Sequence, residues 1–372
     1  QEFNYKNLLG DYLNVSFGYK NTELGNFDIP DNAVIHDDDH DDDHDEEVLS
    51  YVENSDFASD AKQFGISRTA DWGYFGISYE SLESLYGIPF HGDDHGDEHS
   101  EPHATDDDDH DDHDDHDDHD DHDDDHGDEH EGERIFSTTD QTSYNLAGLY
   151  NINGSLIKSV SYNWRDTEYS LTEAHAEEEG HDDHAGEDEH APTVFTNDAI
   201  EYGAIFDLST DVFTQKVAVN FVDEDSAIVG EEAFMNPANN EEFTIGYFVS
   251  TDFDLFYLDA GFRLDQIERT GSVTDEDHGD IDYYKVDDDT NSFALTLGRD
   301  ISDSLDISVG FASVERLPSV IELFMNGPHM ATGRLETGDP NLQSETSDNF
   351  DITLNFDNGN FYASASYYIN DV

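Results

Sequence analysis

Apolar and polar residues alternate along most of the chain with a period of two. In LFYLDAGFRLD, residues 255–265, the even positions from Phe256 to Leu264 are apolar and the odd positions are mainly polar. LDISVGFASVE, residues 305–315, alternates in the same way. This period places successive side chains on opposite faces of a β-strand. The pattern predicts roughly thirteen strands, the others being 12–23, 61–71, 73–84, 141–151, 156–170, 194–208, 213–223, 242–250, 292–300, 349–356 and 361–369.

The connections between these strands alternate between tight and long. The tight ones are rich in Asn, Asp, Gly and Ser, as hairpin turns require, and they read ADWGY, NINGS, LSTDV, STDFD, DISDS and DNGN. The long ones cover about 24–60, 85–140, 171–193, 224–241, 268–290 and 316–348. Consecutive connections of an up-and-down sheet emerge at opposite ends. We therefore expect every tight turn at one edge and every long loop at the other.

Amphipathic strands with short turns at one edge and long loops at the other are typical of an outer-membrane β-barrel. Aromatic residues near strand ends favour this fold, because they suit the membrane interfaces; they are Tyr12, Phe75, Tyr79, Tyr162, Tyr247 and Tyr257. The alternative is a large water-soluble β-protein from a salt-adapted organism. We expect an all-β fold in which 1–372 form part of one antiparallel transmembrane β-barrel, with short periplasmic turns and long, acidic, His-rich extracellular loops.

The charge of the chain is strongly one-sided. There are 92 acidic and 14 basic residues, for a formal net charge of -78, which excludes nucleic acid and favours cationic partners. There is no cysteine, so a metal must be bound through nitrogen and oxygen. No HExxH motif, nucleophile elbow or phosphate loop occurs, and we therefore predict that the protein is not an enzyme.

All 20 histidines fall in the predicted long loops, most of them within acidic runs. In DDDDHDDHDDHDDHDDHDDDH, residues 106–126, imidazole recurs about every third position. Neutral imidazole and carboxylate are ligands for zinc, with copper, nickel and cobalt as weaker candidates, whereas calcium would not explain the histidines. The alternative is an acidic run that only solvates the surface. The candidate ligands are His36, His40, His44, His91, His95, His99, His103, His110, His113, His116, His119, His122, His126, His130, His175, His181, His184 and His190.

These acidic segments contain too few apolar residues to form a core. We expect disordered insertions at about 31–50, 91–134 and 173–192 that collect ions through many weak, overlapping sites.

The segment RLPSVIELFMNGPHMATGRLETGDPNLQSETS, residues 316–347, resembles the barrel signature of TonB-dependent outer-membrane receptors of the zinc-uptake type. Two further stretches agree with this family: GYFGISYESLESLYGIPFH at 73–91 and AIVGEEAFMNP at 227–237. The resemblance implies a barrel of about 22 strands with an N-terminal plug. It also implies that the plug, its TonB-coupling segment and roughly the last third of the barrel lie outside this chain.

The resemblance implies a function in the outer membrane, in contact with its lipid. The receptor would bind a divalent metal ion, with zinc transported and no permanent cofactor, and would couple to TonB through the plug. It makes His329 a candidate ligand in the vestibule, with Glu231, Glu232, Glu336 and Glu345 as possible carboxylate partners. A loop histidine that stabilises its own turn is the alternative for His329. For the whole protein, the alternatives are a receptor for haem or another metal complex, and a surface metal buffer without transport.

Overall fold

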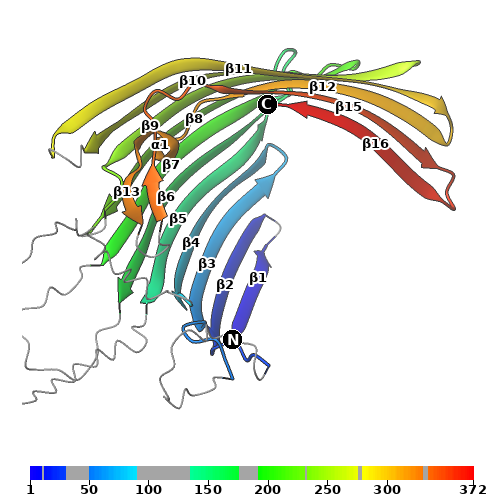
Figure 1. The fold of residues 1–372 in the computed structure, drawn as a ribbon. Helices are drawn as coiled ribbons and strands as arrows, with labels where there is room; N and C mark the ends of the chain where they lie inside the picture. Colours follow the sequence, from blue (N-terminus) through cyan, green and yellow to red (C-terminus); the bar gives the residue numbers. More distant parts are fainter. Residues whose placement is uncertain are drawn as a thin grey trace, which may run out of the picture.

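A single curved sheet dominates the computed structural model, which describes residues 1–10, 12–30, 50–89, 135–175, 192–230, 233–274, 279–329 and 334–372. Its 14 strands are antiparallel and follow chain order, apart from a small hairpin inserted before the last two (Figure 1). They are β1 (Glu2–Leu9), β2 (Leu13–Leu24), β3 (Phe57–Ala70), β4 (Gly73–Gly87), β5 (Ile135–Asn151), β6 (Ser159–His175), β7 (Thr193–Asp207), β8 (Phe213–Val229), β9 (Ala238–Phe253), β10 (Phe256–Thr274), β11 (Ile281–Ser302), β12 (Leu305–Arg316), β15 (Glu345–Asp357) and β16 (Tyr362–Asp371).

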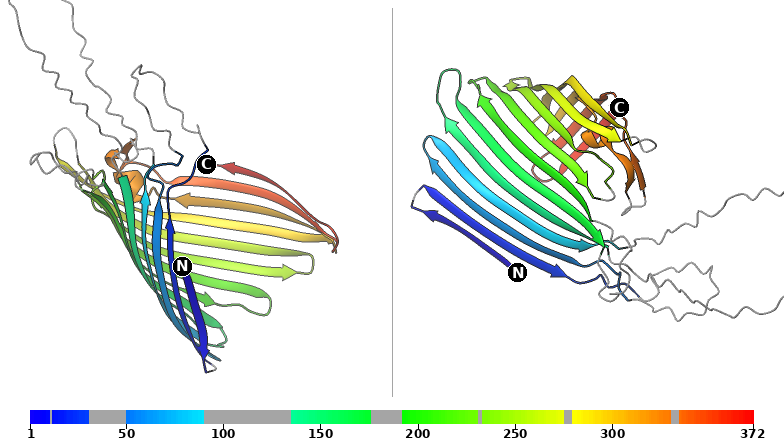
Figure 2. Two further views of the ribbon diagram at one scale, coloured as in Figure 1. Left: turned by 90° about the horizontal axis from the view of Figure 1, so that it is seen from below. Right: turned by 90° about the vertical axis from the view of Figure 1, so that its left-hand side faces the viewer.

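The inserted elements are one short helix, α1 (Val320–Phe324), and the hairpin of β13 (Asn326–His329) and β14 (Arg334–Thr337). They lie on the concave side of the sheet, which curves into an open trough with β1 and β16 at its margins (Figure 2). Among the described residues, no helix is sufficiently long and apolar to cross a membrane. The all-β, up-and-down architecture predicted from the sequence is confirmed.

The two faces of the sheet differ sharply in polarity. On β10, Phe262 and Leu264 leave 45% and 47% of their surface exposed on the convex face, whereas Asp265 is only 4% exposed on the concave face. The Asp265 carboxylate accepts hydrogen bonds from Thr244 Oγ1 at 2.6 Å and Arg263 Nε at 2.7 Å. A continuous exposed apolar face is unfavourable in water and stable against lipid. The convex face therefore has the character of a lipid-facing surface, and the concave face that of a lumen.

The connections alternate as predicted, but several strands are longer than their apolar pattern. β11 begins at Ile281 instead of 292, and β9 begins at Ala238 instead of 242, so the loops predicted at 268–290 and 224–241 are much shorter. These extensions carry polar residues on both faces, as in KVDDD at 285–289, which hides the period of two. The strand β1, the helix α1 and the β13–β14 hairpin were not predicted. Most residues of the insertions predicted at 31–50, 91–134 and 173–192 lie outside the described part; of the last, 173–175 belong to β6.

The polarity of the faces predicts that a charge is costly at one position of β11 and tolerated at its neighbour. Leu295 lies on the apolar convex face and is 45% exposed, and Ala294 lies on the other face. We expect Leu295→Lys to lower the free energy of unfolding in lipid vesicles by about 2–4 kcal/mol. Ala294→Lys is the matched control and should change it little. Equal destabilisation by the two variants, measured by urea titration in vesicles, would contradict this assignment of faces.

Candidate functional site

A loop, residues 317–344, folds back from the end of β12 against the concave wall. At its start, Arg316 Nη1 and Nη2 bind the two carboxylate oxygens of Glu322 at 2.7 and 3.0 Å, and Nη2 also binds Glu345 at 3.0 Å. Ser319 caps α1, because its hydroxyl accepts from the Glu322 amide while the Glu322 carboxylate accepts from the Ser319 amide. These contacts close the loop onto both neighbouring strands.

The carboxyl group of Glu322 is stabilised in its charged form. The bidentate contact with Arg316 and the Ser319 amide lower its pKa from 4.5 to about 2. The charged form of Glu322 is therefore more strongly favoured in the folded loop than in the unfolded chain.

A buried guanidinium joins the same loop to the barrel wall. Arg269 on β10 is 7% exposed, and its Nη1 donates to the carbonyl oxygen of Pro318. Its Nη2 binds Glu242 at 3.0 Å and its Nε binds Asn240 at 3.1 Å. A buried charge is tolerated only when its donors are satisfied and an opposite charge is near. Glu242 supplies the opposite charge from the wall itself, whereas Nη1 has its acceptor, the Pro318 carbonyl oxygen, only while the loop is docked.

An apolar core lies beneath α1. Leu323 and Phe324 are 0% and 1% exposed. They belong to one buried cluster, whose other members are Ile228, Phe234, Met235, Ala238 and Val320. Phe324 lies so close to β10 that a Cβ at Gly271 would overlap its ring. The helix is therefore held flat against the wall, and the chain leaving it is aimed at the edge where the long loops emerge.

His329 ends the first strand of the hairpin and faces the wall formed by β6 and β7. Its ring stacks on Phe234, with ring centroids 4.6 Å apart, and lies 5.9 Å from the ring of Phe195. Its Nε2 is 3.7 Å from Oε2 of Glu173 on β6. Both side chains are about four-fifths buried. Asn326, three residues earlier, fixes the hairpin by donating to the carbonyl oxygen of Thr274 at 2.9 Å.

The structure tests only some of the neighbours proposed for His329. Glu336 lies opposite Gly327 in the hairpin, and Glu345 binds Arg316. Glu231 and Glu232 fall outside the described residues. Glu173, whose carboxylate oxygen lies 3.7 Å from His329 Nε2, was not predicted. Its only signal was its place two residues before His175, in what looked like the start of an acidic loop.

Of the histidines of the acidic runs, only His175 belongs to the described part of the chain. His175 is the last residue of β6, at the long-loop edge, instead of lying in a loop. The remaining predicted ligands fall outside the described residues: His36, His40, His44, His91, His95, His99, His103, His110, His113, His116, His119, His122, His126, His130, His181, His184 and His190. Among described residues, no three His, Asp or Glu side chains gather as a complete metal site.

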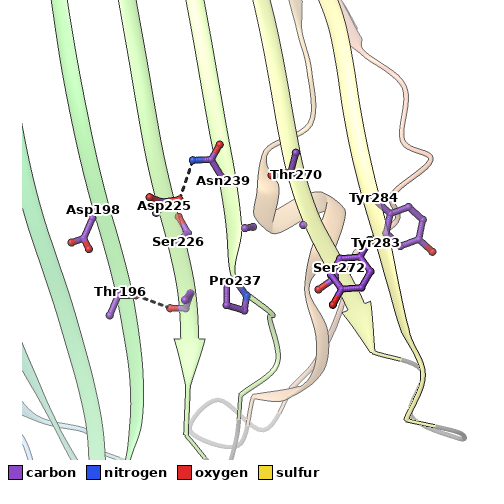
Figure 3. A pocket seen from close by; sticks show the side chains of 13 residues that line it. Thr196, Asp198, Asp225, Ser226, Pro237, Asn239, Thr270, Ser272, Tyr283 and Tyr284 are labelled. Atoms are coloured by element: carbon purple, nitrogen blue, oxygen red, sulfur yellow. Dashed lines mark hydrogen bonds between the residues drawn. The ribbon is translucent and has the colours of Figure 1, made fainter.

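A cavity of about 550 Å³ lies near the ends of β7 to β11 (Figure 3). Asp198, Asp225, Asn239 and Thr270 line it, and Asn239 Nδ2 binds Asp225 at 2.9 Å. These residues are cross-strand partners on one face. Asn240 and Arg269, their neighbours along β9 and β10, serve the opposite face, where the loop docks. The side chains of these four residues are therefore separated from His329 by the sheet.

Comparisons with known proteins agree with this architecture. A family model described as "TonB dependent receptor-like, beta-barrel" matches residues 2–372. Among solved structures, the chain is similar to the copper transporter OprC, with a TM-score of 0.64 and 11% identity over 96% of this chain and 49% of that one. It is similar to the FrpB iron transporter from Neisseria meningitidis, with a TM-score of 0.64 and 13% identity over 98% and 52%.

The hemophore receptor HasR of Serratia marcescens, solved with its hemophore and heme, matches with a TM-score of 0.61 and 13% identity over 97% and 50%. At these identities the likeness concerns the fold. This chain spans about half the length of the solved chains it matches.

The lowered pKa of Glu322 predicts a specific loss of stability in acid. The stabilisation by its carboxylate is complete above pH 4.5 and is lost as the pH falls from there towards 2. Because Glu322 is 40% exposed and screened by solvent, Glu322→Gln should cost only about 1 kcal/mol at neutral pH. We expect the difference in thermal midpoint between this variant and the unchanged protein to shrink across that window. Glu345→Gln, which removes one contact, is the control and should have a smaller effect; a difference independent of pH would contradict the assignment.

Proposed function

This chain belongs to the TonB-dependent receptor β-barrel family, and from that premise we propose that it forms part of a receptor for uptake of zinc ions. It is an outer-membrane protein and not an enzyme. The receptor binds the ion from outside the cell and transfers it inward when TonB acts on a plug domain. No covalent bond is broken in this process, so the site must bind and release the ion through reversible coordination.

The observation that carries this proposal is the pair formed by His329 and Glu173 on the concave wall, 3.7 Å apart. An imidazole nitrogen and a carboxylate oxygen are ligands suited to zinc, which takes four ligands in most sites. Two ligands are half of such a set. The other positions are left for water or for groups outside the described residues.

The docked loop supports a role for His329 in selection. Ring stacking on Phe234 and the anchors at Asn326 and Arg269 hold the imidazole in place before any ligand arrives. A ligand that is held in position loses less conformational entropy on binding. Several residues of the family signature thus support the position of His329.

We assign the acidic histidine tracts to ion collection. The tracts at 31–44, 91–130 and 181–190 interrupt connections whose flanking strands are direct neighbours at the long-loop edge, as in the pairs Leu24↔Phe57 and Gly87↔Phe136. All three therefore originate at the edge where the His329 loop is docked. Many weak sites raise the local concentration of the ion and the chance of its recapture.

A receptor for another metal or a metal complex is the second candidate. The similar solved structures include proteins whose names state copper, iron and heme. Imidazole also binds copper and nickel, and it can serve as an axial ligand of haem. A surface buffer that binds metal without transport is a third candidate, and it would need neither TonB nor a fixed His329.

The first test concerns the paired ligands. In cells carrying the complete receptor, His329→Ala or Glu173→Gln should reduce uptake of labelled zinc at least tenfold, because removing either ligand costs more than 1.4 kcal/mol of binding. Asp198→Asn, on the opposite face, is the control and should leave uptake unchanged. Parallel measurements with copper, nickel and haem identify the cargo. Undiminished zinc uptake by both site variants would contradict the proposal.

The second test separates collection from selection. Deletion of 106–126 should reduce zinc uptake only when external zinc is scarce, because a collecting segment matters little once the ion is abundant. His329→Ala should reduce uptake at both concentrations. The opposite result, in which the deletion abolishes uptake in every condition and His329→Ala acts only in scarcity, would reverse the two roles.

A further inference from the structure

Ser137, near the start of β5, carries a buried hydroxyl group without a partner. The residue is 0% exposed, and its Oγ forms no hydrogen bond within the part of the chain that the structure describes. A buried polar group that is left unpaired costs free energy, and most such groups in folded proteins are paired. An exception on the wall of a binding site suggests that the missing partner arrives with the ligand.

The sheet register places this hydroxyl beside the His329–Glu173 pair. Ser137 is the direct cross-strand partner of Glu173, and Glu173 is the partner of Thr193 on its other side. Directly opposed residues of an antiparallel pair point to the same face, with Cβ atoms about 5 Å apart. Phe195, two residues after Thr193 on that face, lies against the His329 ring. Ser137, Glu173 and His329 thus converge on one region of the concave wall from three different elements.

We propose that Ser137 determines the specificity of this site by donating a hydrogen bond to a water molecule on a partly hydrated divalent cation. The inference rests on the proposed function and narrows its ligand to a small ion bound by Glu173 Oε2 and His329 Nε2. Because no third His, Asp or Glu joins these two ligands among the described residues, the ion keeps water at one or more positions. The Ser137 hydroxyl pairs with that water and is satisfied only in the loaded state.

This arrangement discriminates against an organic metal complex. A chelate whose own donor atoms fill the coordination sphere brings no metal-bound water to Ser137, so the hydroxyl stays buried and unpaired when such a ligand binds. Polar groups that are paired by the correct ligand and left unpaired by a competitor are an effective source of selectivity. The same hydroxyl therefore favours the hydrated ion and disfavours the complex.

The experiment compares Ser137→Ala with Ser143→Ala in the complete receptor purified in detergent. Ser143 is a buried serine on the same strand and face, about 20 Å away, and its hydroxyl is already paired with Thr167 at 3.2 Å. Zinc binding is measured with free zinc set by a chelator buffer, so that weak sites in the loops stay empty. We expect about tenfold weaker binding for Ser137→Ala, the value of one hydrogen bond, and unchanged binding for Ser143→Ala.

Stability provides the readout that separates a ligand-binding role from a structural one. Removing an unpaired buried hydroxyl should leave the thermal midpoint of the metal-free receptor unchanged or raise it. A lower midpoint for metal-free Ser137→Ala, or zinc affinity equal to that of the unchanged receptor, would overturn the inference. If Ser137→Ala binds normally while His329→Ala and Glu173→Gln do not, only this inference fails. If those two variants also bind normally, the proposed site itself is wrong.

Discussion

The burial of one positive charge, the guanidinium of Arg269, organises the site. Its partners come from β9 and from the carbonyl oxygen of Pro318, so the charge is satisfied only when the loop after β12 is docked. Docking seats Phe324 against Gly271 and starts α1 at a fixed point, from which the hairpin carrying His329 follows. Satisfying the buried charge of Arg269 on the wall therefore also fixes the position of the His329 imidazole, which lies more than fifty residues further along the chain.

The wall itself was largely predictable from the sequence, because a strand between lipid and an aqueous lumen must alternate. Leu264 and Asp265 show the alternation at its clearest. The prediction failed where that constraint ends. Beyond the lipid, both faces of a strand meet polar surroundings, and the segment at Ile281–Thr290 therefore carries carboxylates on both sides although its backbone pairing continues. The strand β1 was not predicted because Leu8 and Leu9 interrupt the alternation of its apolar and polar residues.

The site was predictable only in part. His329 stood out because its neighbours match a receptor signature, but most of those neighbours have structural roles: Arg316 and Glu322 bind each other, and Leu323 and Phe324 fill the core. Glu173 and Ser137 could not be found in this way. Their meeting with His329 depends on the pairing of β5, β6 and β7 and on a loop whose histidine lies 156 residues after Glu173 and 192 after Ser137. Such proximity can be recognised only once the register of the sheet is known.

The neighbouring position of the strands that flank each long connection has an evolutionary consequence. Gly87 and Phe136 are cross-strand partners although 48 residues separate them. The pairing of β4 and β5 therefore does not depend on how many residues are inserted between them. The entropic penalty of closing such a connection grows only with the logarithm of its length, by about 0.6 kcal/mol for each doubling. Short repeats can therefore be gained or lost in these tracts, and the capacity for the ion collection that we propose can change, while the barrel keeps its fold.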